Sequence, residues 1–201
     1  MDSCDRFEES SIPIFESYIK SLVKQKKWDM ESVLALVKLY QFYPEKANEN
    51  VLALTLALCL LHVEEQAFSL ALYMVPEKMQ SLGSISKLIA LSECLESAQY
   101  AEFWTKLPEV KAVTSQIDYF AEPVQQFISG VLERTYGSAP KNFVSASLNL
   151  KNKPLIEWIK SHKWVEEGNL VRFTAKNQPA GKVTDGTVNL DYLAQMLTAL
   201  R

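Results

Sequence analysis

Between residues 12 and 136, apolar positions recur at the three- and four-residue spacing of amphipathic helices, and short polar breaks separate the segments. Several segments carry apolar residues on two faces rather than one. Helices stacked in antiparallel pairs bury two faces in this way, because each contacts both its partner and the next pair. No motif of fixed period repeats along the chain. The pattern therefore predicts a mainly α protein built on a degenerate, HEAT/TPR-like helical-repeat stack.

Helix-start signals divide this region into individual elements. Pro13 stands where the first helix begins, and proline is well tolerated in a first helical turn. Asp29 and Asn48 are suited to cap the second and third helices, since their side chains can accept hydrogen bonds from backbone N–H groups. Pro123 is expected either in the first turn of a longer helix that ends near Gly137 or at a kink in that helix.

The longest apolar run, VLALTLALCLLHV at residues 51–63, alternates leucine with smaller residues, which is formally the pattern of a strand. Leucine and alanine nevertheless favour a helix, and few of the residues are β-branched. Ala53 and Ala57 would form a small-residue stripe that lets a neighbouring helix approach closely. The run is also well short of the roughly 20 residues that span a bilayer. We therefore predict a buried helix and no membrane-spanning segment.

A second apolar run, VLALVKLYQFYP at residues 33–44, ends in aromatic residues before a proline. On a helical wheel its apolar residues cover two sides, and Lys38 is the single charge. Pro44 disfavours a helical conformation in the residue before it and so ends the helix. The run is interpreted as a core helix rather than as an aromatic platform for a ligand. With two later tryptophans it supplies the predicted structural core: Leu36, Leu39, Tyr40, Phe42, Trp104 and Trp158.

After Gly137 the pattern changes. A short helix, a turn and a second helix with Pro154 in its first turn are followed by VEEGNLVRFT, which has the pattern of a β-hairpin. The closing segment, VNLDYLAQMLTALR at residues 188–201, is amphipathic. Helix, turn, helix and hairpin is the order of a winged helix. The predicted domains are a helical-repeat domain over residues 1–137 and a small winged-helix domain with a C-terminal helix over residues 138–201.

The composition agrees with a folded, helical protein. Of the 201 residues 48% are hydrophobic, which is enough for a full core, and the net charge is −3. Residues 1–140 hold 12 basic and 19 acidic side chains, whereas residues 141–176 hold 7 and 3. The acidic N-terminus is unlike a secretory signal or a mitochondrial presequence. Cys4, Cys59 and Cys94 are widely spaced, which is typical of reduced thiols in a cytosolic or nuclear protein.

Residues that carry catalytic chemistry are scarce. Neither of the two histidines, His62 and His162, has a second ligand-type residue at metal-binding spacing. The sequence also contains no phosphate-binding glycine loop, no nucleophile elbow and no cysteine–histidine pairing. It therefore predicts a protein that is not an enzyme and that uses no metal and no cofactor.

Two segments are candidate protein interfaces. Residues 170–173 are expected to form an edge strand of the winged helix, open to pairing with a strand of a neighbouring subunit. The closing helix would offer its apolar side to partner helices, although the same side can equally dock on the chain's own winged helix. The candidate interface residues are Leu170, Val171, Arg172, Phe173, Tyr192, Leu193, Met196, Leu197 and Leu200.

A basic cluster lies on and beside the second helix of the predicted winged helix. Its candidate contacts to a nucleic-acid backbone are Lys151, Lys153, Lys160 and Lys163. The alternative is that these lysines simply solvate the exposed side of that helix. No set of Asn, Gln and Arg side chains is displayed to read base edges, so weak contact with an RNA backbone is favoured over sequence-specific DNA recognition.

Four segments carry a family resemblance. LVKLYQFYPE at residues 36–45 resembles the LKLYQFNP motif of the k-subunit family of eukaryotic translation initiation factor 3, with Tyr43 where asparagine is usual. LSECLESAQYAEFWTKL at residues 91–107 is similar to a helix of that family followed by a short helix with Phe-Trp. QQFISGVLERTY and LIEWIKSHKW resemble its later helix and its winged-helix segment. The resemblance runs in consistent order through residues 30–175.

This resemblance implies a function as well as a fold. The family is a compact member of the PCI group of initiation-factor, proteasome-lid and signalosome subunits, in which a helical-repeat domain precedes a winged helix. The implied role is a non-catalytic scaffold subunit that acts on the small ribosomal subunit, in the cytoplasm with a possible nuclear pool. The implied partners are other initiation factor 3 subunits, above all the l subunit. Two alternatives stay open: a PCI-type subunit of the signalosome or proteasome lid, and a winged-helix RNA-binding module.

Overall fold

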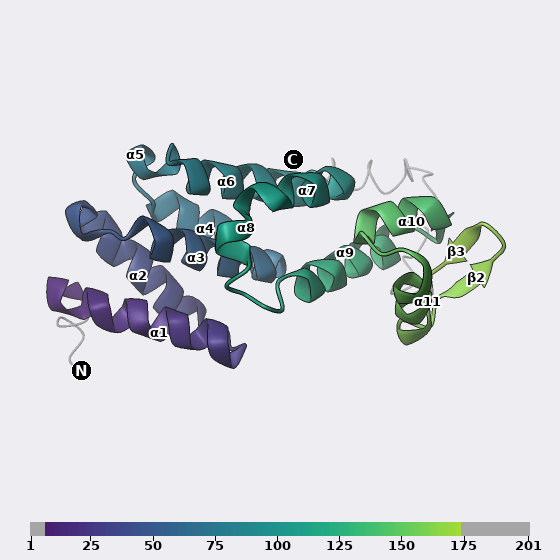
Figure 1. Cartoon of the computed structure of the whole chain (residues 1–201), viewed down its shortest axis with the longest axis horizontal. Coiled ribbons are helices and arrows are strands. Elements are labelled where there is room, and N and C mark those ends of the chain that lie inside the picture. The colour runs from purple at the N-terminus through teal and green to yellow at the C-terminus, as the bar shows by residue number, and fades with distance from the viewer. Residues whose placement is uncertain (1–6, 174–201) are drawn as a thin grey trace, which may run out of the picture.

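The computed structural model describes residues 7–173, and most of them form helices. Figure 1 shows the N-terminal helices packed side by side, α9 leading away from them, and a small domain with a sheet at the opposite end. This arrangement confirms the predicted helical stack followed by a small winged-helix-like domain. The helices up to the small domain are α1 (Ile12–Gln25), α2 (Met30–Phe42), α3 (Glu49–Cys59), α4 (Ala67–Met74), α5 (Glu77–Gln80), α6 (Gly83–Glu96), α7 (Tyr100–Lys106), α8 (Lys111–Thr114) and α9 (Ala121–Thr135).

Short 3-10 segments and capping residues join these helices. The segments are η2 (Glu9–Ser11), η3 (Pro44–Lys46), η4 (Leu60–Glu65) and η5 (Leu107–Val110). Asp29 Oδ1 accepts a hydrogen bond at 3.2 Å and Asn48 Oδ1 accepts one at 3.3 Å, each from a backbone N–H three residues on. Pro13 and Pro123 lie in the first turns of α1 and α9. The helix starts therefore follow the local signals in the sequence, because capping needs only nearby residues.

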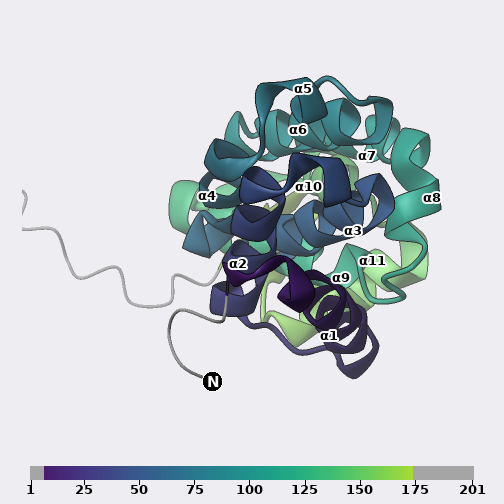
Figure 2. The same ribbon diagram turned by 90° about the vertical axis from the view of Figure 1, so that its left-hand side faces the viewer.

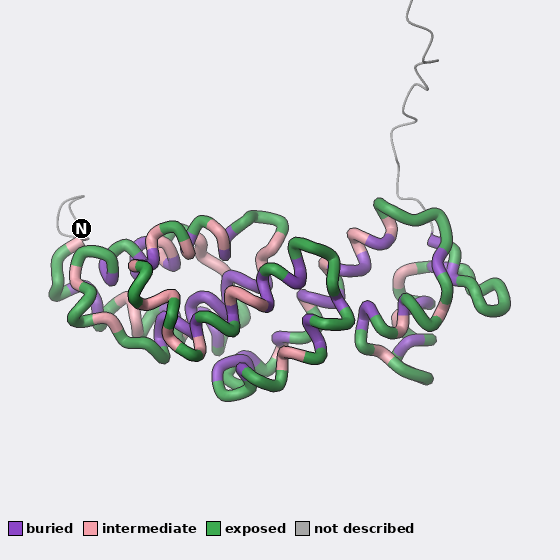
Figure 3. The backbone as a smooth tube through the Cα atoms, turned by 90° about the horizontal axis from the view of Figure 1, so that it is seen from above, coloured by how far each residue is buried: buried purple, intermediate pink, exposed green. Residues whose placement is uncertain are grey.

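Helix α3 lies at the centre of the stack. Every residue from Val51 to Cys59 is buried, and α3 contacts α4, α6 and α8. In the end-on view of Figure 2, α3 is surrounded by its neighbours, and in Figure 3 buried segments run through the interior of the stack. Thr55, the polar residue in this stretch, donates to the Val51 carbonyl oxygen at 2.7 Å. The alternating leucine pattern is thus that of a helix buried on all sides, as predicted.

The predicted core residues are interior with one clear exception. Fully or almost fully buried are Leu36, Leu39, Tyr40 and Trp104. Trp158 is partly buried and packs against the core. The prediction for Phe42 is wrong, because its side chain is 53% exposed and its ring packs edge-on against Phe7, 6.3 Å away. Phe42 is the last residue of α2 and lies on the opposite side of that helix from Tyr40.

The small domain combines two helices with a three-stranded antiparallel sheet. Its elements are β1 (Ser138–Pro140), α10 (Lys141–Leu148), α11 (Asn152–Ser161), β2 (Val165–Glu167) and β3 (Leu170–Arg172). The strand order is β1-β3-β2, so the predicted hairpin is present. Gly168 has φ +62° in the turn between β2 and β3, a left-handed conformation that glycine adopts without steric cost. The sequence did not predict β1, because three residues ending in proline show no strand pattern.

The stack and the small domain pack against each other. Helix α7 contacts α10, and α9 contacts both α10 and η4. Two tryptophans of the small domain also reach α9: Trp158 Nε1 donates to Ser129 Oγ and Trp164 Nε1 donates to Glu133 Oε1, each at 2.8 Å. Helix α9 is therefore shared between the two packing units, and a domain division after residue 137 stays a prediction.

Part of the prediction falls beyond this structure. The expected C-terminal helix at residues 188–201 lies outside the described residues. So do five candidate interface residues: Tyr192, Leu193, Met196, Leu197 and Leu200. Within residues 7–173, no helix is both long enough and apolar enough to cross a membrane.

Candidate interaction surfaces

The exposed edge of the hairpin is β2, not the strand expected from the sequence. Strand β3 lies between β1 and β2 and pairs with both, so the prediction that residues 170–173 form an open edge is wrong. The cause is that β1, which precedes α10 and α11 in the sequence, pairs with β3 and makes it the middle strand. All three residues of β2 are exposed, and the Val165 side chain is 51% exposed. Strand β2 is therefore open to pairing with a strand of another chain.

Of the four candidate interface residues in and after β3, two are buried and two are exposed. Val171 is fully buried and Phe173 is 5% exposed, with its ring edge-on to a tryptophan of the same domain. Both belong to the domain's own core, so the prediction that they contact a partner is wrong. Leu170 is 44% exposed, and Arg172 forms an ion pair of 3.1 Å with Glu167 on the hairpin surface. Leu170 and Arg172 are the two that a partner can reach.

The lysines of the predicted nucleic-acid surface are all exposed. Exposed on or next to α11 are Lys151, Lys153, Lys160 and Lys163. Leu155 and Ile159 lie on the buried side of α11. Glu157 is also exposed on α11 and reduces the local positive charge. Both sequence interpretations, backbone contact and a solvated face, fit this geometry, and nucleic-acid binding stays a prediction.

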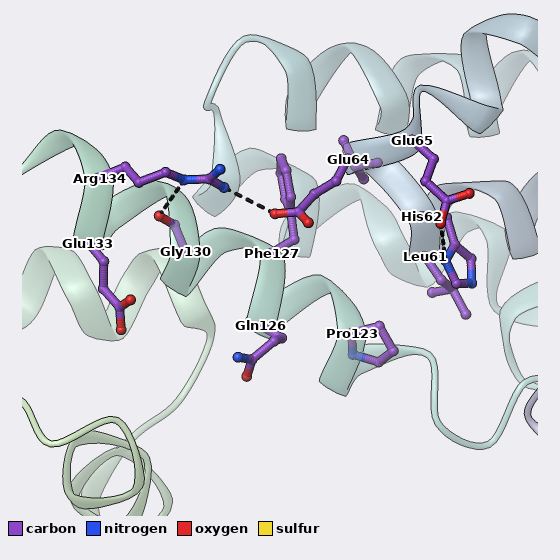
Figure 4. A pocket seen from close by; sticks show the side chains of 11 residues that line it. Leu61, His62, Glu64, Glu65, Pro123, Gln126, Phe127, Gly130, Glu133 and Arg134 are labelled. Atoms are coloured by element: carbon purple, nitrogen blue, oxygen red, sulfur yellow. Dashed lines mark hydrogen bonds and ion pairs between the residues drawn. The ribbon is translucent and has the colours of Figure 1, made fainter. Parts of the chain in front are cut away.

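A cleft of about 560 Å³ lies between η4 and α9. Arg134 Nη2 and Glu64 Oε1 form an ion pair of 3.1 Å between α9 and η4, and Arg134 Nε donates to the Gly130 carbonyl oxygen at 3.0 Å (Figure 4). Phe127 of α9 also lines the cleft. Both charged side chains are about two-thirds exposed, so the ion pair adds little to stability. The sequence did not reveal this cleft, because the paired residues are 70 positions apart.

An aromatic cluster lies beside this cleft. The rings of His62 and Trp28 are stacked with centroids 4.0 Å apart, and Trp28 Nε1 donates to Glu65 Oε2 at 2.8 Å. Burial lowers the pKa of His62, while the Glu65 carboxylate, 3.8 Å from His62 Nδ1, partly opposes this shift. The cluster ties the loop before α2 to η4. Within residues 7–173, no group of three or more His, Cys, Asp and Glu residues is placed to hold a metal ion.

These surfaces belong to a helical stack that continues into a winged helix, an architecture that defines a class of helical scaffold proteins. The sequence comparisons narrow that class. A family model described as the CSN8/PSMD8/EIF3K family matches residues 46–183, and the chain belongs to this family. The match extends from the second inter-helix segment through the whole described part of the small domain. The family resemblance inferred from the sequence motifs is thereby confirmed.

Similar curated proteins share one description, "Eukaryotic translation initiation factor 3 subunit K". The protein from Anopheles gambiae is 24% identical over 199 residues, which cover 98% of this chain and 90% of the relative. The protein from Bombyx mori is 26% identical over 203 residues, covering 100% and 93%. The protein from Nematostella vectensis is 23% identical over 200 residues, covering 98% and 93%. The similarity therefore runs through the helical stack and the winged helix alike.

Proposed function

We propose that this chain is a structural, non-catalytic subunit of the eukaryotic translation initiation factor 3 complex and supports initiation on the small ribosomal subunit. The observation that carries the proposal is the similarity to relatives described as subunit K over nearly the full length of both chains. This description favours the initiation factor over the signalosome and the proteasome lid. The expected location is the cytoplasm, where translation takes place, with a nuclear pool as a further expectation.

The first partner that we expect is the l subunit of the same complex, alongside other initiation factor 3 subunits. Strand β2 supports this expectation, because its exposed edge leaves backbone N–H and C=O groups for a partner strand. Leu170 and Arg172 lie on the neighbouring strand with exposed side chains. Contact with the small ribosomal subunit is expected through the assembled complex.

A weak RNA contact is a second, minor part of the proposal. The exposed lysines on and next to α11 support it, since ammonium groups close together in the chain attract phosphates without reading sequence. Filter binding of a single-stranded RNA across a salt series tests it. We expect weak binding that falls with salt, and a shallower salt slope in the triple variant Lys153→Ala, Lys160→Ala and Lys163→Ala. An unchanged slope would contradict the contact.

Affinity purification of the tagged full chain from its native cells tests the main proposal. Identification of the co-purifying proteins should show subunits of initiation factor 3, with the l subunit among the most abundant. Recovery of signalosome or proteasome-lid subunits in their place would overturn the assignment.

A single substitution then tests the edge strand. Val165→Lys places a charge on the exposed edge of β2 and should reduce recovery of the l subunit by about 10-fold, because edge lysines discourage strand pairing. Ile14→Lys on α1 is a matched control, since Ile14 is 58% exposed at the other end of the molecule. Equal recovery with both variants would remove β2 from the interface and leave the complex assignment intact.

A further inference from the structure

Helix α4 exposes apolar side chains on its outer side. Ala67, Phe68 and Ala71 face the core and are buried. On the outer side Leu70 is 43% exposed and Tyr73 is 85% exposed, the highest exposure among the large apolar residues of the described chain. A helix that is apolar on all sides is normally covered on all sides. The outer side of α4 thus has the composition of a contact surface.

Tyr73 stands between two hollows. One, of about 220 Å³, lies between α4 and α6, where Leu72 and Ile89 line it. The other, of about 490 Å³, lies on the side of η4 and α9 and includes Leu70 and Phe127. Val63 and Phe127 line both the second hollow and the cleft of Figure 4, so these two adjoin. We call the two hollows beside Tyr73 together with the adjoining cleft the α4 groove.

The rim of the α4 groove is acidic. Five carboxylates line it, and Arg134 is the one lysine or arginine among the described lining residues. The carboxylates are Glu64, Glu65, Glu93, Glu96 and Glu133. Glu96 Oε1 accepts hydrogen bonds of 3.2 Å from the hydroxyls of Ser69 and Ser92, which leaves its charge uncompensated. Within residues 7–173, no ion pair neutralises Glu93, Glu96 or Glu133.

We propose that the α4 groove binds a basic amphipathic helix of a partner protein. An apolar stripe on such a helix would fill the hollows on both sides of Tyr73, which is the helix-in-groove mode of recognition. Lysine or arginine residues flanking the stripe would meet the acidic rim, near Glu93 and Glu96. The negative charge of the rim favours a basic partner, because it would repel an acidic helix or a nucleic-acid backbone. This surface is separate from the winged-helix contacts proposed above and does not depend on them.

A synthetic peptide tests the groove on the full-length protein. The probe is a fluorescent amphipathic helix of leucine and lysine, about 18 residues long so that it can be helical, and its counterpart carries glutamate at every lysine position. Anisotropy titrations should show binding of the lysine peptide and at least about 10-fold weaker binding of the glutamate peptide. Equal binding of the two peptides would overturn the proposal.

Two variants and two controls locate the binding. Tyr73→Ala should weaken binding of the lysine peptide about 10-fold, because a central exposed tyrosine acts as an anchor, and Glu93→Gln should weaken it about 3-fold with a reduced salt dependence. Both side chains are exposed, so neither change should lower the melting temperature. Ile14→Ala and Glu45→Gln alter exposed residues away from the groove and should leave binding unchanged. Equal loss in controls and groove variants would overturn the assignment.

Two other occupants give distinct results. If the groove binds a second copy of this chain, sedimentation velocity should show a dimer that Tyr73→Ala dissociates. That result would overturn the proposal of a partner helix in favour of self-association. The chain's own residues 188–201 would compete with the probe, so the full-length double variant Leu193→Asp and Leu197→Asp would then bind the lysine peptide more tightly. A monomer whose affinity for the lysine peptide is unchanged by that double variant supports an external helix.

Discussion

Trp104 Nε1 donates a hydrogen bond of 2.8 Å to the backbone carbonyl oxygen of Ser147, and both residues are buried. The bond joins α7 of the stack to α10 of the small domain across 43 residues of sequence. A second buried bond, from Gln125 Nε2 to the Leu148 carbonyl oxygen at 2.8 Å, lies in the same junction. Side chains of α7 and α9 thus bind the last turn of α10. These buried hydrogen bonds fix the position of the small domain relative to the helical stack.

Replacing this donor should weaken the whole protein. Trp104→Phe removes the indole N–H and leaves a buried carbonyl with one partner fewer, so we expect a loss of about 1–3 kcal/mol in the free energy of unfolding. Urea denaturation followed by circular dichroism measures it. Trp28→Phe is the matched control, because Trp28 donates to a solvent-exposed carboxylate and its loss should cost less. A larger loss for Trp28→Phe would contradict the importance of the junction.

Truncation to alanine should destabilise the protein far more at Tyr40 than at Phe42. Tyr40 is fully buried and its hydroxyl donates to Glu16 Oε1 at 2.6 Å, so Tyr40→Ala should cost about 3–5 kcal/mol. Phe42 is half exposed, and Phe42→Ala should cost less than about 1 kcal/mol. Thermal and urea melts of the two variants measure the difference. No loss of stability in Tyr40→Ala would show that the aromatic end of α2 is not part of the core.

The His62 cluster predicts a pH dependence of stability. Burial lowers the pKa of His62 below its ordinary value of 6.5, so the unfolded chain binds more protons than the native protein near that pH. The contribution of neutral His62 is present above about pH 6.5, the unfolded-state value, and is lost as the pH falls from there through the lower pKa of the folded state. The free energy of unfolding should therefore be lower at about pH 5.5 than at about pH 7.5.

His62→Phe isolates this effect. Phenylalanine keeps a ring against Trp28 and has no proton to bind, so the difference between the two pH values should shrink in the variant. His162 is present in both proteins and cancels in the comparison. A pH dependence of the same size in both proteins would rule out His62 as its source.

Cys59 should be unreactive in the native protein. It is fully buried in α3, and burial raises the pKa of its thiol, which disfavours the nucleophilic thiolate. Iodoacetamide labelling followed by peptide mass analysis should find Cys59 unmodified in buffer and modified in denaturant. Cys94 is also buried, so its labelling in buffer should be compared with that of Cys59 in the same sample. Rapid native labelling of Cys59 would mean that α3 opens on the time scale of the reaction.

Helix α2 and the sheet each contain a feature that local sequence patterns do not encode. The helical wheel placed apolar residues on two sides of α2, and it could not distinguish a side covered by a neighbouring helix from one left in solvent. Tyr40 and Phe42 differ in just this respect. In the sheet, VEEGNLVRFT predicts a hairpin through local turn chemistry. It does not reveal that Ser138–Pro140 pairs with β3, which places β3 in the middle of the sheet and leaves β2 as the open strand of the hairpin.

Apolar periodicity and capping act over a few neighbouring residues, so local patterns were enough to predict the helical class, the helix starts at Asp29 and Asn48, the buried state of α3 and the order of the winged helix. Tertiary packing settles which apolar sides stay exposed, that β3 is the middle strand of the sheet, and that Glu64 of η4 forms an ion pair with Arg134 of α9. These features depend on contacts between distant segments, and a local pattern carries no information about which distant segment will cover it.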